Sequence, residues 1–285
     1  MNKLDLIDLH THTCYSDGEL TPDELIIKAK NNGVRTLAIT DHDTLMGIQN
    51  MTLTEKDTGV RVITGIEFSI KVPVGRMHIL GYNIDIWNNK LNERLIQLHN
   101  RSLYAVCGLI CQLKKDFNIG FSTEEILEIL NEKRNIGRPD VAKLLVKYNF
   151  VPTVQAAFDS YLIPAYEKMG VIAKGITYEE CVSLIKEAGG LVVLAHPISL
   201  KKTNIELDTY IKELIDIGLD GIEVYHSDHS QENIEKYLEI AEKYNLLISG
   251  GSDYHGLNVK PDIEIGHGRN NIKIKQLTLL DKIKN

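Results

Sequence analysis

Short apolar runs alternate with amphipathic stretches over most of the chain. The runs predict buried strands, and segments with apolar residues every three or four positions predict helices. The expected strands are residues 4–9, 36–40, 60–68, 77–82, 191–195, 221–225 and 246–249. The expected helices are residues 22–32, 44–57, 178–188, 207–217 and 231–244, the first with Thr21 as its N-cap. This alternation predicts parallel βα units in a barrel or an open sheet.

The pattern changes between residues 89 and 169. Apolar residues recur there at helical spacing, as in Leu91, Leu95 and Leu98, and no strand is expected. The simplest interpretation is one α/β domain, residues 1–99 and 170–285, interrupted by a small helical domain at residues 100–169.

Composition limits the partners and the compartment. The chain has 285 residues, a net charge of -7 and a pI of about 5.8, so it lacks the basic field that would hold long duplex nucleic acid. The four cysteines have no paired spacing, and neither a signal peptide nor a run of about 20 apolar residues is found. We therefore expect a cytoplasmic protein with no membrane segment, acting on a small phosphorylated substrate; the oligomeric state stays open.

Ionisable residues gather where the expected strands end. In parallel α/β folds the active site is built at that edge. Each segment also has a structural interpretation, such as a turn at Asp41–Asp43 or a core histidine at His196. Together they predict one site, from residues that lie on six separate segments: His10, His12, Asp41, His42, Asp43, Glu67, His78, His196, Asp253 and His255.

Histidine together with carboxylate suits Zn, Mn or Fe, whereas Mg and Ca prefer oxygen ligands alone. In an extended segment, His10 and His12 share a face and can hold one ion. A carboxylate such as Glu67 can bridge two ions, and two ions about 4 Å apart can clamp a phosphoryl group.

With these residues in hand, the sequence resembles the PHP (polymerase and histidinol phosphatase) superfamily. The resemblance spans nearly the whole chain, in order. It is carried by residues 8–13 (DLHTHT), 16–18 (SDG), 39–44 (ITDHDT), 65–69 (GIEFS), 78–82 (HILGY), 194–197 (LAHP) and 251–256 (GSDYHG).

The resemblance implies a distorted (β/α)7 barrel with two or three divalent metal ions, Mn, Fe or Zn, in its mouth. It implies three ligand groups with Glu67 shared by two: His10, His12, Glu67 and Asp253; Glu67, His78 and His196; Asp17, His42 and His255. The implied mechanism is attack on phosphorus by a hydroxide that bridges the first two metals. Asp17, His42 and His255 are the catalytic candidates, stabilising or protonating the leaving oxygen.

The helical insertion points to a subgroup. Residues 135–142 (NIGRPDVA) and 154–162 (VQAAFDSYL) resemble the insert of stand-alone PHP phosphoesterases, where it would cap the substrate side. These enzymes act on nucleoside 3',5'-bisphosphates or, as 5'-3' exonucleases, on RNA 5' ends. Arg138 is then a phosphate-binding candidate or a surface arginine. Two departures concern specificity: Asp140 stands where the subgroup has histidine, and the loop 163–176 lacks the usual glycine-rich, basic form.

His226 and His229 are further substrate-binding candidates, or serve only local hydrogen bonding. The alternatives to a nucleotide or short-oligonucleotide phosphoesterase are a histidinol-phosphate phosphatase, an amidohydrolase-type metal enzyme and a non-catalytic metal-binding accessory domain. The insertion disfavours the first of these, and the absence of a metal-bridging lysine disfavours the second. The complete ligand set disfavours the third.

Overall fold

A computed structural model of the chain describes residues 5–131, 136–169 and 175–283. The chain divides into two compact units, Met1–Asn92 with Gly175–Asn285, and Glu93–Lys174. Asn135 of the insertion motif and residues 170–174 lie outside the described residues. The expectation of a loop at residues 163–176 is wrong for residues 163–168, which form a helix. Among the described residues, no helix is both long and apolar enough to cross a membrane.

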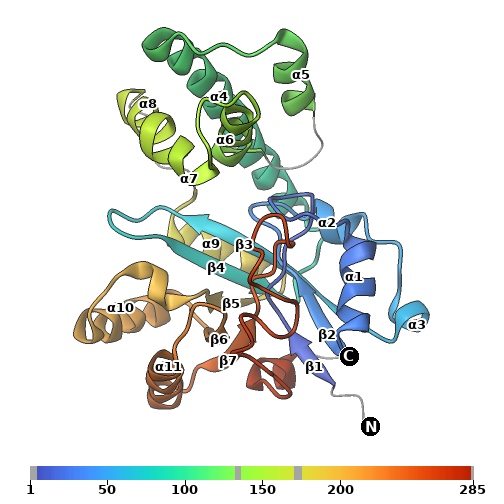
Figure 1. Cartoon of the computed structure of the whole chain (residues 1–285). Coiled ribbons are helices and arrows are strands. Elements are labelled where there is room, and N and C mark those ends of the chain that lie inside the picture. Colours follow the sequence, from blue (N-terminus) through green and yellow to red (C-terminus); the bar gives the residue numbers. More distant parts are fainter. Residues whose placement is uncertain (1–4, 132–135, 170–174, 284–285) are drawn as a thin grey trace. The chain divides into compact units, whose positions relative to one another are not determined.

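The first unit is built on a seven-stranded sheet whose strands follow one another in chain order (Figure 1). The strands are β1 (Leu6–Asp8), β2 (Val34–Ile39), β3 (Arg61–Ile70), β4 (Met77–Tyr82), β5 (Leu191–Leu194), β6 (Gly221–His226) and β7 (Leu247–Gly251). The sheet curls so that its first and last strands meet: the Leu9 N–H donates to the Gly250 carbonyl at 3.1 Å. A side chain at Gly251 would collide with the His10 backbone there. The expected distorted (β/α)7 barrel with a helical insertion is confirmed.

One strand corrects the expectation of parallel βα units. β1–β2–β3 and β5–β6–β7 pair in parallel, but β4 is antiparallel to both β3 and β5. The connection between β3 and β4 is only residues 71–76, whereas a parallel crossover needs about a dozen residues or more. As a result, the beginning of β4 lies at the edge where the other strands end.

Helices pack on the outside of the sheet (Figure 1). They are α1 (Pro22–Asn31), α2 (Met46–Gln49), α3 (Glu55–Thr58), α9 (Tyr178–Glu187), α10 (Asn204–Ile217) and α11 (Gln231–Tyr244), with 3-10 turns at Pro197–Leu200 and Thr278–Lys282. Thr21 caps α1 through a capping box with Glu24, as predicted. The core beneath the site includes Leu9, Leu80, Tyr82 and Val193, all fully buried.

The single helix expected at residues 44–57 is wrong, because two short helices stand there instead. The Asp23 carboxylate accepts hydrogen bonds from the backbone N–H groups of Thr52 and Leu53, at 2.9 and 3.0 Å. Thr54 then caps α3 with its own side chain. These side-chain contacts compete with helical backbone bonds, so the helix is interrupted.

The second unit is helical, and its described residues contain no strand. Its elements are α4 (Asn89–Phe117), which begins before the division, α5 (Thr123–Asn131), α6 (Arg138–Lys147), α7 (Val154–Ala157), a π-helical turn (Phe158–Leu162) and α8 (Ile163–Lys168). It has its own core, in which Leu109, Leu113 and Leu145 are fully buried. Its role as a cap on the substrate side stays a prediction.

Candidate metal centre

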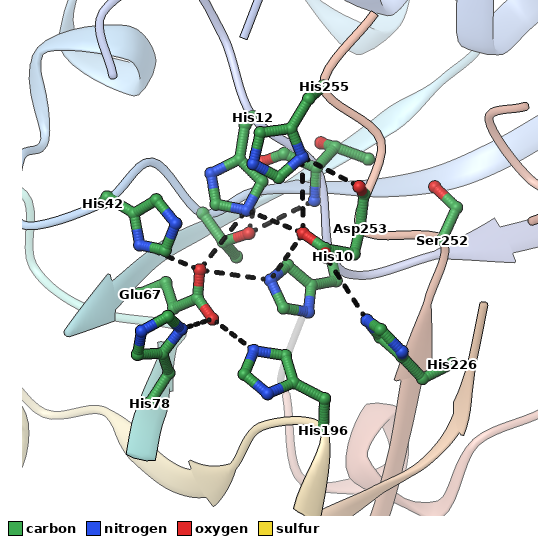
Figure 2. A network of polar contacts seen from close by, with 12 residues as sticks. His10, His12, His42, Glu67, His78, His196, His226, Ser252, Asp253 and His255 are labelled. Carbon is green, nitrogen blue, oxygen red and sulfur yellow. Dashed lines mark hydrogen bonds and ion pairs between the residues drawn. The ribbon is translucent and has the colours of Figure 1, made fainter. Parts of the chain in front are cut away.

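The nine side chains predicted as ligands lie together at one edge of the sheet, and Figure 2 labels all of them except Asp17. Most follow the end of a strand, whereas Glu67 lies within β3 and His78 near the start of the antiparallel β4. The nine are His10, His12, Asp17, His42, Glu67, His78, His196, Asp253 and His255.

Four of their atoms surround one position. The Nε2 atoms of His10 and His12 each lie 3.3 Å from Glu67 Oε2, and 3.6 and 3.3 Å from Asp253 Oδ1. An ion held tetrahedrally at about 2.0–2.2 Å from nitrogen and oxygen keeps neighbouring ligand atoms about 3.3–3.6 Å apart. These four distances between imidazole nitrogen and carboxylate oxygen match that spacing, and His10, His12 and Glu67 form a cluster that could hold an ion.

Glu67 divides its two oxygens between two groups of histidines. Oε2 faces His10 and His12, and it lies 3.0 Å from His42 Nδ1. Oε1 lies 2.9 Å from both His78 Nδ1 and His196 Nε2. This side chain, which is 1% exposed, is thus placed to bridge two cation positions.

A third group lies on the other side of His12. Asp17 Oδ1 is 3.2 Å from His255 Nε2 and 3.7 Å from His12 Nδ1, and Asp17 Oδ2 is 3.9 Å from His42 Nε2. His12 therefore borders two groups, which the sequence did not indicate. A neutral imidazole has one lone pair, so only one of its nitrogens can bind an ion.

Hydrogen bonds elsewhere on two rings fix which nitrogen carries the proton. His196 Nδ1 lies 3.0 Å from Ser199 Oγ, whose own hydrogen is donated to the Arg76 carbonyl. His196 Nδ1 is therefore the donor, and its Nε2 presents a lone pair to Glu67. His255 Nδ1 donates to the Asp253 carbonyl at 2.8 Å, so its Nε2 likewise presents a lone pair to Asp17.

A lone pair that faces a carboxylate oxygen is repelled unless a proton or a metal cation lies between them. The buried His10 Nε2, His12 Nε2 and Glu67 Oε2 atoms have no hydrogen-bond partner in the part of the chain that the structure describes. Leaving such atoms unsatisfied costs about 1–3 kcal/mol each, and more for charged groups. The donor set therefore fits divalent metal ions.

The pKa values of these groups reflect the same close packing. Burial lowers the pKa of His12 to about 3, helped by His255, which keeps the ring neutral and able to bind metal. Burial alone would raise the pKa of Glu67, but the imidazoles of His42 and His78 outweigh it and hold the pKa well below its usual range. Glu67 is therefore an anion at the centre of the group.

Three buried carboxylates hold the ligand segments, and of these the sequence had indicated only Asp41 as a site residue. Glu223 Oε1 is 2.9 Å from His10 Nδ1, and its Oε2 accepts the His196 backbone N–H at 2.7 Å. Asp8 accepts from Ser252 at 2.8 and 2.6 Å, and Asp41 accepts hydrogen bonds from residues 13 and 16. A signal existed for Glu223, because it is a charged residue inside an apolar strand.

The two further histidines have different surroundings. The Asp228 N–H donates to His226 Nδ1 at 3.0 Å, so the neutral ring carries its proton on Nε2, which lies 3.4 Å from Asp253 Oδ2. The buried Nε2 atom has no hydrogen-bond partner among the described residues, and His226 lies in a cluster with His10 and Glu223 that could hold an ion. His229 Nδ1 donates to the Val224 carbonyl at 2.8 Å, and its ring packs edge-on against Tyr237. Substrate contact by either histidine stays a prediction.

Arg138 lies in the second unit, at the start of α6. Its guanidinium carbon is 4.9 Å from the centroid of the Tyr166 ring and 5.8 Å from that of Phe158. Asp140, one of the two departures from the subgroup, accepts the Gly137 N–H at 2.6 Å. Asp140 thus stabilises the beginning of the helix that carries Arg138.

Comparisons with known proteins identify the family of this chain. The model of the family described as PHP domain matches residues 8–189. A phosphoribosyl 1,2-cyclic phosphate 1,2-diphosphodiesterase of Eggerthella lenta is 31% identical over 87% of this chain and 94% of its own. A 3',5'-nucleoside bisphosphate phosphatase of Chromobacterium violaceum is 29% identical over 87% of each chain. The 5'-3' exoribonuclease Rnm of Salmonella typhimurium is 31% identical over 92% of this chain and 88% of its own.

A solved structure agrees as well. The chain from Bifidobacterium adolescentis, provisionally named a metal-dependent phosphoesterase, matches with a TM-score of 0.75 at 30% identity. The match covers 88% of this chain and 87% of that one.

Proposed function

This chain belongs to the PHP domain family, and we propose that it is a metal-dependent phosphoesterase that hydrolyses phosphate esters of nucleotides or short RNA. The observation that carries this proposal is the close approach, at 3.3–3.6 Å, of the His10 and His12 Nε2 atoms to carboxylate oxygens of Glu67 and Asp253. Imidazole with carboxylate suits Zn, Mn or Fe in preference to Mg or Ca.

We assign the ligands to three positions. The first would be held by His10, His12, Glu67 and Asp253, and the second by His78 and His196 with the other oxygen of Glu67. The third would be held by Asp17, His42 and His255. Each group offers carboxylate and imidazole atoms within hydrogen-bonding or ion-pairing distance of one another.

Divalent ions supply two things when bound: they neutralise charge on phosphoryl oxygens, and they make hydroxide available near neutral pH. The protein supplies the alignment. Glu223 fixes the His10 ring by accepting from Nδ1, and Ser199 does the same for His196. Asp17, the most exposed carboxylate of the set at 37%, would lie with His42 and His255 on the side where the leaving oxygen departs.

The three curated relatives suggest the substrate class. Their names describe a cyclic phosphate of phosphoribose, a nucleoside bisphosphate and RNA, and all three contain a phosphate ester of ribose. We propose that this chain acts on the same class of ester. The net charge of -7 favours a short substrate over a long one, which would need an extended basic track. The first relative adds a cyclic phosphodiester to the candidates that the sequence suggested.

A hydrolysis panel with Mn2+ tests the proposal. It compares 3'-phosphoadenosine 5'-phosphate, a short 5'-phosphorylated RNA, phosphoribosyl 1,2-cyclic phosphate and histidinol phosphate, each with and without a chelator. We expect chelator-sensitive turnover of at least one ribose ester, faster than that of histidinol phosphate. Faster hydrolysis of histidinol phosphate would favour that alternative, and no turnover of any compound would favour a non-catalytic metal-binding domain.

A further inference from the structure

A lysine that the sequence gave no reason to choose lies against the centre. Lys260 Nζ is 2.6 Å from Asp253 Oδ2, and its side chain is 33% exposed. The turn before it sets its place: the Lys260 backbone N–H donates to the Gly256 carbonyl at 2.8 Å, and the Asn258 N–H donates to Glu19 at 3.1 Å. The contact is therefore part of a built loop.

The two oxygens of Asp253 have different partners. Oδ1 faces the Nε2 atoms of His10 and His12 at 3.6 and 3.3 Å. Oδ2 faces Lys260 at 2.6 Å and His226 Nε2 at 3.4 Å, and Figure 2 shows His226 on this side. The hydrogen bond to Oδ2 comes from Lys260, which has only N–H groups and can only donate.

The backbone at Asp253 is fixed as well. Its φ of 57° is left-handed, which is uncommon for a residue with a side chain and concentrates at functional sites. The Asp253 N–H donates to the His10 carbonyl at 2.9 Å. Backbone and side chain thus hold the carboxylate in one orientation.

We propose that Lys260 is a positioning residue, which occupies Asp253 Oδ2 and makes Asp253 a one-oxygen ligand through Oδ1. A carboxylate can bind a metal through one oxygen or through both. Without a donor on Oδ2, the carboxylate can turn and offer both oxygens. The inference rests on the metal binding that we propose for this centre.

The ion pair contributes little to the stability of the fold, because its lysine is partly exposed to solvent. A positive charge also repels an incoming divalent ion, so the lysine aids metal binding only through the orientation that it imposes. Removing the charge would strengthen metal binding, whereas losing the orientation would weaken it. The measured metal affinity of a Lys260 variant therefore distinguishes the two effects.

The test is a Co2+ titration of the full chain, followed by visible absorption, for wild type, Lys260→Met, Lys260→Arg and the control Lys275→Met. Lys275 is exposed on the C-terminal segment, away from the centre. We expect Lys260→Met to weaken the tightest site about 10–100-fold, the usual cost of losing a group that orients a ligand. Its absorption should also weaken as the coordination number rises. Lys260→Arg should restore most of the affinity, and Lys275→Met should match wild type.

Wild-type or tighter Co2+ binding by Lys260→Met would overturn the inference, because the charge would then matter more than the orientation. A raised KM with unchanged Co2+ affinity would also overturn it and assign Lys260 to substrate binding. Failure of the wild type to bind Co2+ at all would instead contradict the proposed function. Thermal unfolding of each variant without metal shows whether it is folded.

Discussion

His10 is held by Glu223: the imidazole Nδ1 lies 2.9 Å from the carboxylate Oε1, and both side chains are completely buried. The bond turns Nε2 towards Glu67 and Asp253. It also explains why a charged residue lies inside the apolar strand β6. Outer carboxylates of this kind set the orientation and basicity of a metal-binding imidazole.

Glu223→Ala should therefore weaken metal binding although Glu223 binds no metal itself. The substitution frees the His10 ring and removes the acceptor of the His196 N–H at 2.7 Å. We expect the affinity to fall about 10–100-fold. Isothermal titration with Mn2+ measures it, with Glu235→Ala on the exposed face of α11 as the control. Equal affinities of the two variants would show that the Glu223 bond is dispensable.

Metal affinity should rise with pH, because His10 must lose a proton before it can bind an ion. Burial alone would lower its pKa, but the carboxylates of Glu223 and Glu67 outweigh burial and raise the pKa well above the ordinary value. Without metal, His10 therefore keeps its second proton to a higher pH than an ordinary histidine, and it must lose that proton to bind an ion. Titrations in buffers of different ionisation enthalpy should show proton release. Binding that is independent of pH and releases no proton would contradict this assignment.

Glu67→Ala should abolish turnover, because it removes oxygens from two of the proposed positions. Bound metal ions supply several kcal/mol of transition-state stabilisation, so a fall in kcat of roughly 10³-fold is expected. Asp253→Ala should behave in the same way. Circular dichroism and thermal unfolding show whether each variant keeps its fold. Folded protein with near-wild-type hydrolysis would exclude these residues from the reaction.

Arg138→Ala should raise KM while leaving metal affinity unchanged, if Arg138 binds a substrate phosphate. Its guanidinium lies over the rings of Tyr166 and Phe158, which restrict its orientation. Arg138→Lys should also raise KM, because a lysine cannot form the bidentate contact with phosphate that a guanidinium makes. An unchanged KM for every ribose ester would leave Arg138 a helix-start residue without a substrate role.

The sequence predicts the sheet and the ligand segments well, because both depend on local patterns. Strand positions follow from apolar runs, and ligands such as His10 and His196 stand where those runs end. The antiparallel β4 follows from the shortness of its connection to β3, which apolar periodicity alone does not take into account.

The contacts of the supporting residues could not be predicted, because their partners are distant in the chain. Asp8 accepts from Ser252, and His10 pairs with Glu223, which is 213 positions away. The ion pair of Lys260 with Asp253 depends on the turn that Gly256 begins. Such contacts arise only once the barrel closes and brings β1 beside β7.

The central claim is that buried imidazole and carboxylate atoms at the end of the barrel hold divalent metal ions. Anomalous diffraction from crystals soaked in Mn2+ tests it most directly. We expect a strong peak within bonding distance of His10 Nε2, His12 Nε2, Glu67 Oε2 and Asp253 Oδ1, and a second beside Glu67 Oε1. Fully formed crystals with no anomalous peak among these atoms would contradict the account.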